Sequence, residues 1–183
     1  MKRISDLEKK YVNQVLDNEF ATSLNAVFNN RLEAAFAKEF NVRYAIGHAN
    51  GTCTMHTALA ALGIGVGDEV ICPALTMTST SLAILHNGSI PVFADVNPHT
   101  FEIDPQSIEK VITYDPIIDL CKKYKLALIE DNAECYLGMY KGRKAGEFGD
   151  FASFSFQASK HLTTGEGGML ICNKEDLADN ARR

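Results

Sequence analysis

The stretch GDFASFSFQASKHLTTGEGGMLIC, residues 149–172, carries the pattern that decides the fold. Residues 151–156 alternate bulky and small side chains, which is typical of a buried strand, and residues 169–172 resume strand character after a segment of small residues. We therefore expect Lys160 on a short loop between two strands, with glycines nearby that allow backbone or ligand to approach. A lysine held on apolar elements can lose its proton and act as an amine nucleophile. The alternative is a solvated loop lysine.

The rest of the chain alternates strand patterns with helix patterns. Short apolar runs predict strands at residues 42–46, 69–72, 91–95 and 127–130. Apolar residues at helical spacing predict helices at residues 4–16, 29–40, 53–62, 79–86, 104–112 and 116–124, and residues 177–183 resemble the middle of another helix. We expect Asp104 to begin its helix, with Pro105 in the first turn. The alternation predicts a three-layer α/β fold, in which helices cover both faces of a mostly parallel central sheet.

Composition restricts the class of protein. The chain has 183 residues, of which 46% are hydrophobic and 22% charged, and it shows no linker, so we expect one domain spanning residues 1–183. The net charge of -5 provides no basic surface for nucleic acid or an anionic membrane, so we expect neither as a partner. No apolar run approaches the length of a membrane span, and no apolar segment follows the charged start to form a signal peptide.

Cysteine and histidine usage indicates the compartment and argues against a metal site. The five cysteines are scattered without paired spacing, which predicts buried thiols in a reducing cytoplasm rather than disulfides or a zinc site. The five histidines show no metal-ligand spacing, and we expect no metal.

Three further features join Lys160. The residues Gly51, Thr52 and Cys53 begin a predicted helix, where free N–H groups favour a phosphate; the alternative is a plain turn capped by Thr52. Asp131 directly follows a predicted strand, where α/β folds bind ligands, or else it caps a helix. Ser155 lies in the strand leading to Lys160 and faces either a bound phosphate or a crowded core.

Together these groups are the parts that pyridoxal phosphate needs. The amine attaches to the cofactor aldehyde, and the carboxylate keeps the pyridine nitrogen protonated so that the ring can accept electrons. The helix start and the hydroxyl groups hold the phosphate.

The chain resembles the sugar aminotransferases of the DegT/DnrJ/EryC1/StrS family, within fold type I of the pyridoxal-phosphate enzymes. The resemblance covers most of the chain from about Phe36 onward. It is carried, in the family's order, by NGTCTMHTALAALGIGVGDEVICPALT, PVFADVNPHTFEID, IEDNAECYLGMYKGRKAGEFGDFASFSF and KHLTTGEGG. Each stretch is weak evidence alone, but the combination is specific.

The resemblance implies a role for each matching position. Lys160 would carry the cofactor, and Asp131 would pair with its pyridine nitrogen. The phosphate would be bound by Gly51, Thr52 and Ser155, with help from the backbone of Cys53. Glu134 falls where many relatives place a glutamine beside the phenolic oxygen of the cofactor, and some members that act on nucleotide-linked sugars carry glutamate there. The alternative for Glu134 is a surface residue of the following turn.

The sequence departs from the family pattern in three places. Met77 stands where relatives usually stack an aromatic ring on the cofactor; a methionine can cover the ring by apolar contact, or it can be plain core. Between Thr113 and Tyr114 the family normally has a further strand and loop, so the chain is expected to be shortened there or to lack residues. The family's C-terminal small domain does not follow Arg183, so we expect this chain to be the large domain only.

By the resemblance, the reaction is amino transfer to a nucleotide-linked 4-keto-6-deoxy sugar in the biosynthesis of amino sugars for surface polysaccharide. Glutamate is the expected donor, and a homodimer would complete the site at the subunit interface. One alternative is a dehydratase of the same family that uses the aminated cofactor; those relatives replace the lysine by histidine, and His161 is one position away. Another is a non-catalytic regulatory protein that retains the scaffold. The sequence does not specify the sugar, the nucleotide or the ring carbon.

Overall fold

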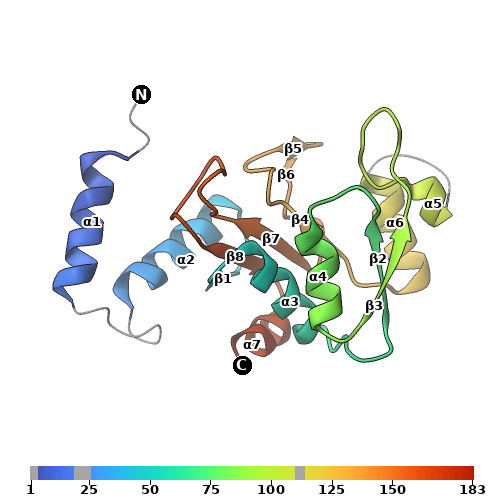
Figure 1. The fold of residues 1–183 in the computed structure, drawn as a ribbon, viewed down its shortest axis with the longest axis horizontal. Helices are drawn as coiled ribbons and strands as arrows, with labels where there is room; N and C mark the ends of the chain where they lie inside the picture. The colour runs from blue at the N-terminus through green and yellow to red at the C-terminus, as the bar shows by residue number, and fades with distance from the viewer. Residues whose placement is uncertain (1–3, 19–25, 110–113) are drawn as a thin grey trace.

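The computed structural model describes residues 4–18, 26–109 and 114–183 (Figure 1). Its central sheet has four strands, in the spatial order β1 (Tyr44–His48), β8 (Gly168–Cys172), β7 (Phe151–Ser155) and β4 (Ile129–Asp131). Strand β8 is antiparallel to both of its neighbours, whereas β4 and β7 are parallel. The central sheet is therefore mixed.

Helices cover both faces of this sheet. The alternating side chains of β7 point to opposite sides. Phe154 packs against Phe36 and Phe40 of helix α2 (Val27–Glu39) on one face. Phe151 lies on the other face, in a cluster with residues from α3 (Gly51–Ala61) and α7 (Glu175–Arg182). The predicted three-layer α/β fold is confirmed.

A pair of buried hydroxyl groups fixes helix α3 to the sheet. The Oγ1 atom of Thr54 lies 2.5 Å from the Oγ atom of Ser153 in β7, and it donates to the carbonyl of Gly51 at 2.6 Å. Both side chains are buried, and hydrogen bonding satisfies their polar groups. The start of α3 is thereby held beside the carboxyl end of β7.

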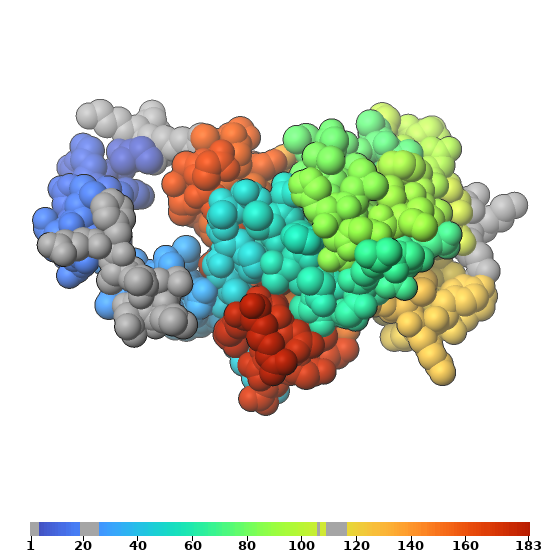
Figure 2. Space-filling model, turned by 60° about the horizontal axis from the view of Figure 1, so that its bottom comes forward, coloured from blue at the N-terminus to red at the C-terminus, as the bar shows by residue number. Residues whose placement is uncertain are grey.

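Two further strands form a separate sheet. Strands β2 (Glu69–Pro73) and β3 (Ile90–Ala94) are parallel and are connected by helix α4 (Thr78–His86). Helix α4 packs beside α3, and Figure 2 shows α3, α4 and α7 side by side on one surface of the molecule. The strand patterns in the sequence do not predict this division into two sheets.

The remaining elements lie around these layers. Helix α1 (Asp6–Asp17) stands at one end of the molecule and contacts α2 through the rings of Tyr11 and Phe28, whose centroids are 5.7 Å apart (Figure 1). The other elements are helices α5 (Pro105–Glu109) and α6 (Tyr114–Tyr124) and the hairpin of β5 (Met139–Tyr140) and β6 (Arg143–Lys144). No helix among the described residues is long and apolar enough to cross a membrane.

Most elements lie within two residues of their predicted bounds. The helix predicted at 104–112 is described only as Pro105–Glu109, because residues 110–113 fall outside the described ranges. The strand predicted at 127–130 begins only at Ile129. The β5–β6 hairpin was not predicted, since its strands have two residues each and are too short to show a pattern.

Candidate active site

Lys160 lies in the connection between β7 and β8, as the sequence predicts. Its backbone N–H donates to the carbonyl of Gln157 at 2.9 Å, which turns the chain. The Lys160 side chain is only 11% exposed, and its ammonium forms an ion pair with the carboxylate of Glu134, whose side chain is 71% exposed. The alternative of a solvated loop lysine therefore does not hold.

Asp131 ends strand β4, three residues before Glu134. Its Oδ2 atom accepts a hydrogen bond from the Oγ1 atom of Thr80 at 3.0 Å, and its Oδ1 atom accepts one from the N–H of Ala133 at 3.2 Å. Residues 132–138 form turns, so the alternative role of Asp131 as a helix cap is wrong. Asp131 and Lys160 are linked to the same short turn through Glu134.

Thr80 was missed by the sequence analysis. It lies in the first turn of α4, and its Oγ1 atom is 3.2 Å from that of Thr76. Two threonines four residues apart at a helix start are a weak signal, because such pairs also occur as local caps. The bond from Thr80 to Asp131 joins helix α4 to the end of strand β4 at the candidate site.

Gly51 and Ser155 meet at the start of α3. The alternation along β7 directs Ser155 toward this helix, where the side chain is buried. A Cβ atom on Gly51 would lie 2.9 Å from the Cβ atom of Ser155, so only glycine fits. The first-turn N–H groups of a helix lack intrahelical partners and can bind an anion. The structure thus brings the predicted phosphate-binding residues together.

The cap of α3 is Asn50 rather than Thr52. The Oδ1 atom of Asn50 accepts a hydrogen bond from the N–H of Cys53 at 2.8 Å. The alternative of a turn capped by Thr52 is therefore wrong, because the helix begins two residues earlier than predicted. Thr52 and Cys53 are both half-buried in this first turn.

Tyr136 braces the end of β7 and was also missed. Its hydroxyl donates to the carbonyl of Ser155, and its ring lies 5.7 Å from that of Phe154 and 6.4 Å from that of His161, centroid to centroid. Burial, followed by the nearby Glu134 carboxylate, raises the pKa of Tyr136 to about 12. The phenol therefore remains a hydrogen-bond donor at neutral pH.

Met77 precedes α4 at the edge of this site. Its side chain is 66% exposed, so the alternative of a plain core residue is wrong. Its carbonyl accepts the N–H of Thr80 at 3.0 Å, which places Met77 one turn from the residue that holds Asp131. The methionine can cover a flat group bound beside Asp131 by soft apolar contact.

These residues fit the cofactor that the resemblance implies. An amine shielded from solvent, a carboxylate at a strand end and a glycine-lined helix start lie at the carboxyl ends of β4 and β7. Gly51 packs directly against Ser155, so the Ser155 hydroxyl lies beside the first-turn N–H groups of α3, which can bind an anion.

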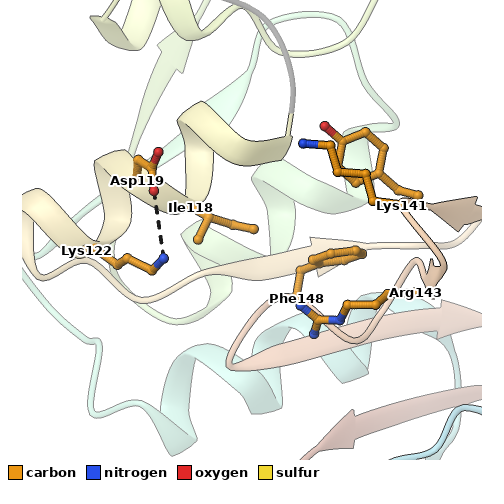
Figure 3. A pocket seen from close by; sticks show the side chains of 7 residues that line it. Ile118, Asp119, Lys122, Lys141, Arg143 and Phe148 are labelled. Carbon is orange, nitrogen blue, oxygen red and sulfur yellow. Dashed lines mark ion pairs between the residues drawn. The ribbon is translucent and has the colours of Figure 1, made fainter.

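A separate hollow lies away from these residues. It has a volume of about 580 Å³ and is shared by α6, the β5–β6 hairpin and Phe148 (Figure 3). Figure 3 shows the guanidinium of Arg143 beside the ring of Phe148, at 4.3 Å from its centroid. None of the candidate site residues lines this hollow. Within the described ranges, no group of three or more histidine, cysteine or acidic side chains is arranged to hold a metal ion.

Comparisons with known proteins identify relatives of this arrangement. GDP-perosamine synthase of Caulobacter vibrioides is 38% identical over 197 aligned residues, which cover 98% of this chain and 53% of that protein. The solved aminotransferase from Psychrobacter cryohalolentis is 34% identical, with a TM-score of 0.92, and the match covers 98% of this chain and 50% of that one. A solved GDP-4-keto-6-deoxymannose-3-dehydratase (ColD) with bound GDP-perosamine is 27% identical, with a TM-score of 0.88. That match covers 97% of this chain and 52% of the dehydratase.

The chain spans about half the length of the curated relatives it matches. The family model described as the DegT/DnrJ/EryC1/StrS aminotransferase family matches residues 2–115 and 114–183, two segments that together span nearly all of the sequence. The solved relatives share its α/β architecture, which is that of fold type I. The chain therefore belongs to the DegT/DnrJ/EryC1/StrS aminotransferase family.

Proposed function

We propose that this chain is the cofactor-binding large domain of a pyridoxal-phosphate-dependent aminotransferase that acts on a nucleotide-linked 4-keto-6-deoxy sugar. The observation that carries the proposal is the shielded ammonium of Lys160, joined through Glu134 to the turn that follows Asp131. The family membership and the relatives named GDP-perosamine synthase support the sugar substrate.

The cofactor would be held at both of its ends by residues already near one another. Its phosphate would bind the first-turn N–H groups of α3 together with Thr52 and Ser155, which Gly51 allows to lie close to the helix start. Its ring nitrogen would pair with Asp131, which Thr80 orients, and Met77 would cover the ring. When bound, the cofactor supplies an electron sink for charge that develops on the reacting carbon.

Lys160 and Glu134 would hold and transfer the protons of the reaction. Glu134 forms an ion pair with the Lys160 ammonium and holds it beside the turn that follows Asp131, and the lysine acts as a nucleophile in its neutral amine form. The neutral Lys160 amine would take a proton from the substrate carbon as a general base and return a proton to the product as a general acid. A lysine at this position favours amino transfer over the dehydratase alternative, whose relatives use histidine.

The larger assignment concerns the whole protein. We propose glutamate as the donor, amino-sugar biosynthesis for surface polysaccharide in the cytoplasm as the setting, and a homodimer whose partner subunit and small domain complete the site. The exposure of Met77 and Glu134 supports this assembly, because both side chains border a surface that a second subunit can cover.

Covalent trapping tests the proposal directly. Purified chain is mixed with pyridoxal phosphate, reduced with borohydride and digested, and mass spectrometry locates the modified lysine. We expect modification at Lys160 and its loss in Lys160→Ala, with Lys125→Ala as the control on an exposed lysine outside the site. Equal labelling of several lysines, or normal amino transfer by Lys160→Ala, would contradict the assignment.

A second measurement separates the alternatives. Glutamate is added to the cofactor-loaded chain, and conversion of the bound cofactor to its amine form is followed by absorbance. We expect conversion with a matching yield of 2-oxoglutarate. Binding without conversion would instead favour the regulatory protein, and a deoxygenated sugar product without net amino transfer would favour the dehydratase.

A further inference from the structure

Strands β4 and β2 each have an edge without a neighbouring strand among the described residues. Among the described residues, β4 pairs only with β7, and β2 pairs only with β3. The outer edge of such a strand exposes backbone N–H and carbonyl groups that can pair with another chain.

The two open edges belong to the same part of the molecule. Ile129 of β4 packs against the cluster formed by Leu59, Cys72 and Ile84, and Val70 of β2 packs against that same cluster. At the carboxyl ends of the strands, Thr80 donates to Asp131 across the division between the sheets. We call the position between β2 and β4 the open strand position.

Fewer residues beside the open strand position pair in a sheet than the sequence predicts. The apolar segment 127–130 has a strand pattern, but pairing begins only at Ile129. Leu126 is 47% exposed, and Ile71 and Val92, which are register partners in β2 and β3, are 44% and 37% exposed. Parallel sheets are normally buried on both faces, so these side chains leave apolar surface exposed beside the open strand position.

The comparisons indicate where relatives carry the residues of the strand that this chain lacks. The alignment with the Caulobacter protein spans 197 positions although it covers 98% of these 183 residues, so that protein carries residues that this chain lacks. The family model matches in two segments that meet at residues 114 and 115. This junction lies between β3 and β4 in the chain, and a strand followed by α6 and β4 would form a right-handed crossover unit beside β4.

We propose that the open strand position is a docking site for one extended, apolar segment of another polypeptide, about five residues long and parallel to β2 and β4. Backbone hydrogen bonds to both edges would supply the affinity, as in other cases of strand addition. The segment would be rich in β-branched residues, because a central parallel strand is buried on both faces. This inference rests on the fold and does not depend on the proposed enzymatic activity.

A synthetic peptide provides the test. The probe has the sequence that the Caulobacter protein carries between the positions aligned with Thr113 and Tyr114, and it bears a fluorescent label. Titration with the purified 183-residue chain should give a saturable rise in anisotropy. Hydrogen exchange should slow at residues 69–73 and 126–131. The same peptide with N-methyl groups on alternate residues keeps its side chains but loses backbone donors, and it should bind at least ten-fold more weakly.

A matched pair of variants tests the location. Ile71→Lys changes a strand beside the open position, whereas Ile90→Lys changes a similarly exposed isoleucine on β3, the strand farther away (44% and 50% exposed). We expect at least a ten-fold loss of peptide affinity for Ile71→Lys and less than a two-fold change for Ile90→Lys, with unchanged circular dichroism for both.

Three results would overturn the inference. These are the absence of saturable binding, equal binding of the N-methylated peptide, and protection confined to other parts of the chain. The alternative occupant is a second copy of this chain. If sedimentation shows a dimer that the peptide does not disperse, and residues 69–73 and 126–131 are already protected in it, a second copy occupies the position and the proposed partner is wrong.

Discussion

Gly51 allows the start of α3 to lie directly against Ser155 of β7. Because an added Cβ atom would lie 2.9 Å from the Cβ atom of Ser155, Gly51→Ala should force α3 and β7 apart and cost about 1–3 kcal/mol of unfolding free energy. It should also weaken binding of pyridoxal phosphate by at least ten-fold. Denaturant unfolding and cofactor titration measure the two effects.

Gly65→Ala is the matched control for that change. Gly65 has no atom within 4 Å of an added Cβ and does not have a positive φ, so alanine should be tolerated there with no loss of cofactor binding. Equal effects of the two substitutions would show that the approach of Gly51 to Ser155 is unimportant.

Tyr136 gives the fold a dependence on alkaline pH. Its pKa is raised to about 12 from an ordinary value of 10.0, so the folded state holds the proton more tightly than the unfolded state. The stabilisation associated with the protonated phenol is complete below pH 10 and is lost as the pH rises toward about 12.

Tyr136→Phe should remove this dependence and, at neutral pH, about 1 kcal/mol of stability through the lost bond to Ser155. The measurement is unfolding free energy between pH 7 and 11.5 for both proteins. The difference between the two proteins isolates Tyr136 from the other titrating groups. A difference that does not shrink with rising pH would contradict the assigned cause.

The sequence predicts features that depend on residues close together in the chain. The buried strand predicted at residues 151–156 is confirmed as β7, on which Phe151 and Phe154 lie on opposite faces. The partners of Thr80 and Tyr136 are 51 and 19 residues away in the chain, and no local pattern encodes such contacts. The error at Thr52 is of another kind, since Asn50 and Thr52 are both good caps two residues apart and sequence patterns locate helix ends poorly.

At the scale of the element, helix α3 depends on its cap. Asn50→Ala removes the side-chain acceptor for the N–H of Cys53 and should cost about 1 kcal/mol of unfolding free energy. Asn30→Ala, at an exposed interior position of α2, should be neutral or slightly stabilising because alanine favours helix. Thermal unfolding of the two variants tests this, and a larger loss for Asn30→Ala would be inconsistent with the cap.

Strand patterns identify strands but not their neighbours. The segments that form β2, β3 and β4 were each predicted from apolar runs, and their bounds are close to those observed. Pairing, in contrast, depends on which other segments are available. The division into two sheets was therefore not predictable from any single strand, even though the shortened junction at Thr113 and Tyr114 was visible in the sequence.

At the scale of the whole molecule, a strand inserted in the same chain at the open strand position should unite the two sheets. Insertion of the Caulobacter segment between Thr113 and Tyr114 should raise the melting temperature by several degrees, because it buries apolar surface and pairs both edges. It should also abolish binding of the free peptide. A Gly/Ser insertion of equal length is the control and should not stabilise the chain, and equal melting temperatures for the two insertions would count against the open strand position.

The bond from Thr80 to Asp131 joins an α4 residue to the end of β4. Any molecule that alters the spacing of β2 and β4 must also alter how this carboxylate is held, and any ligand that engages the carboxylate must act back on that spacing. Thermodynamic reciprocity then makes the two occupancies interdependent, with the same coupling factor in each direction. A split subunit of this design would be an allosteric sensor, able to report the arrival of a missing strand as a change in vitamin B6 affinity.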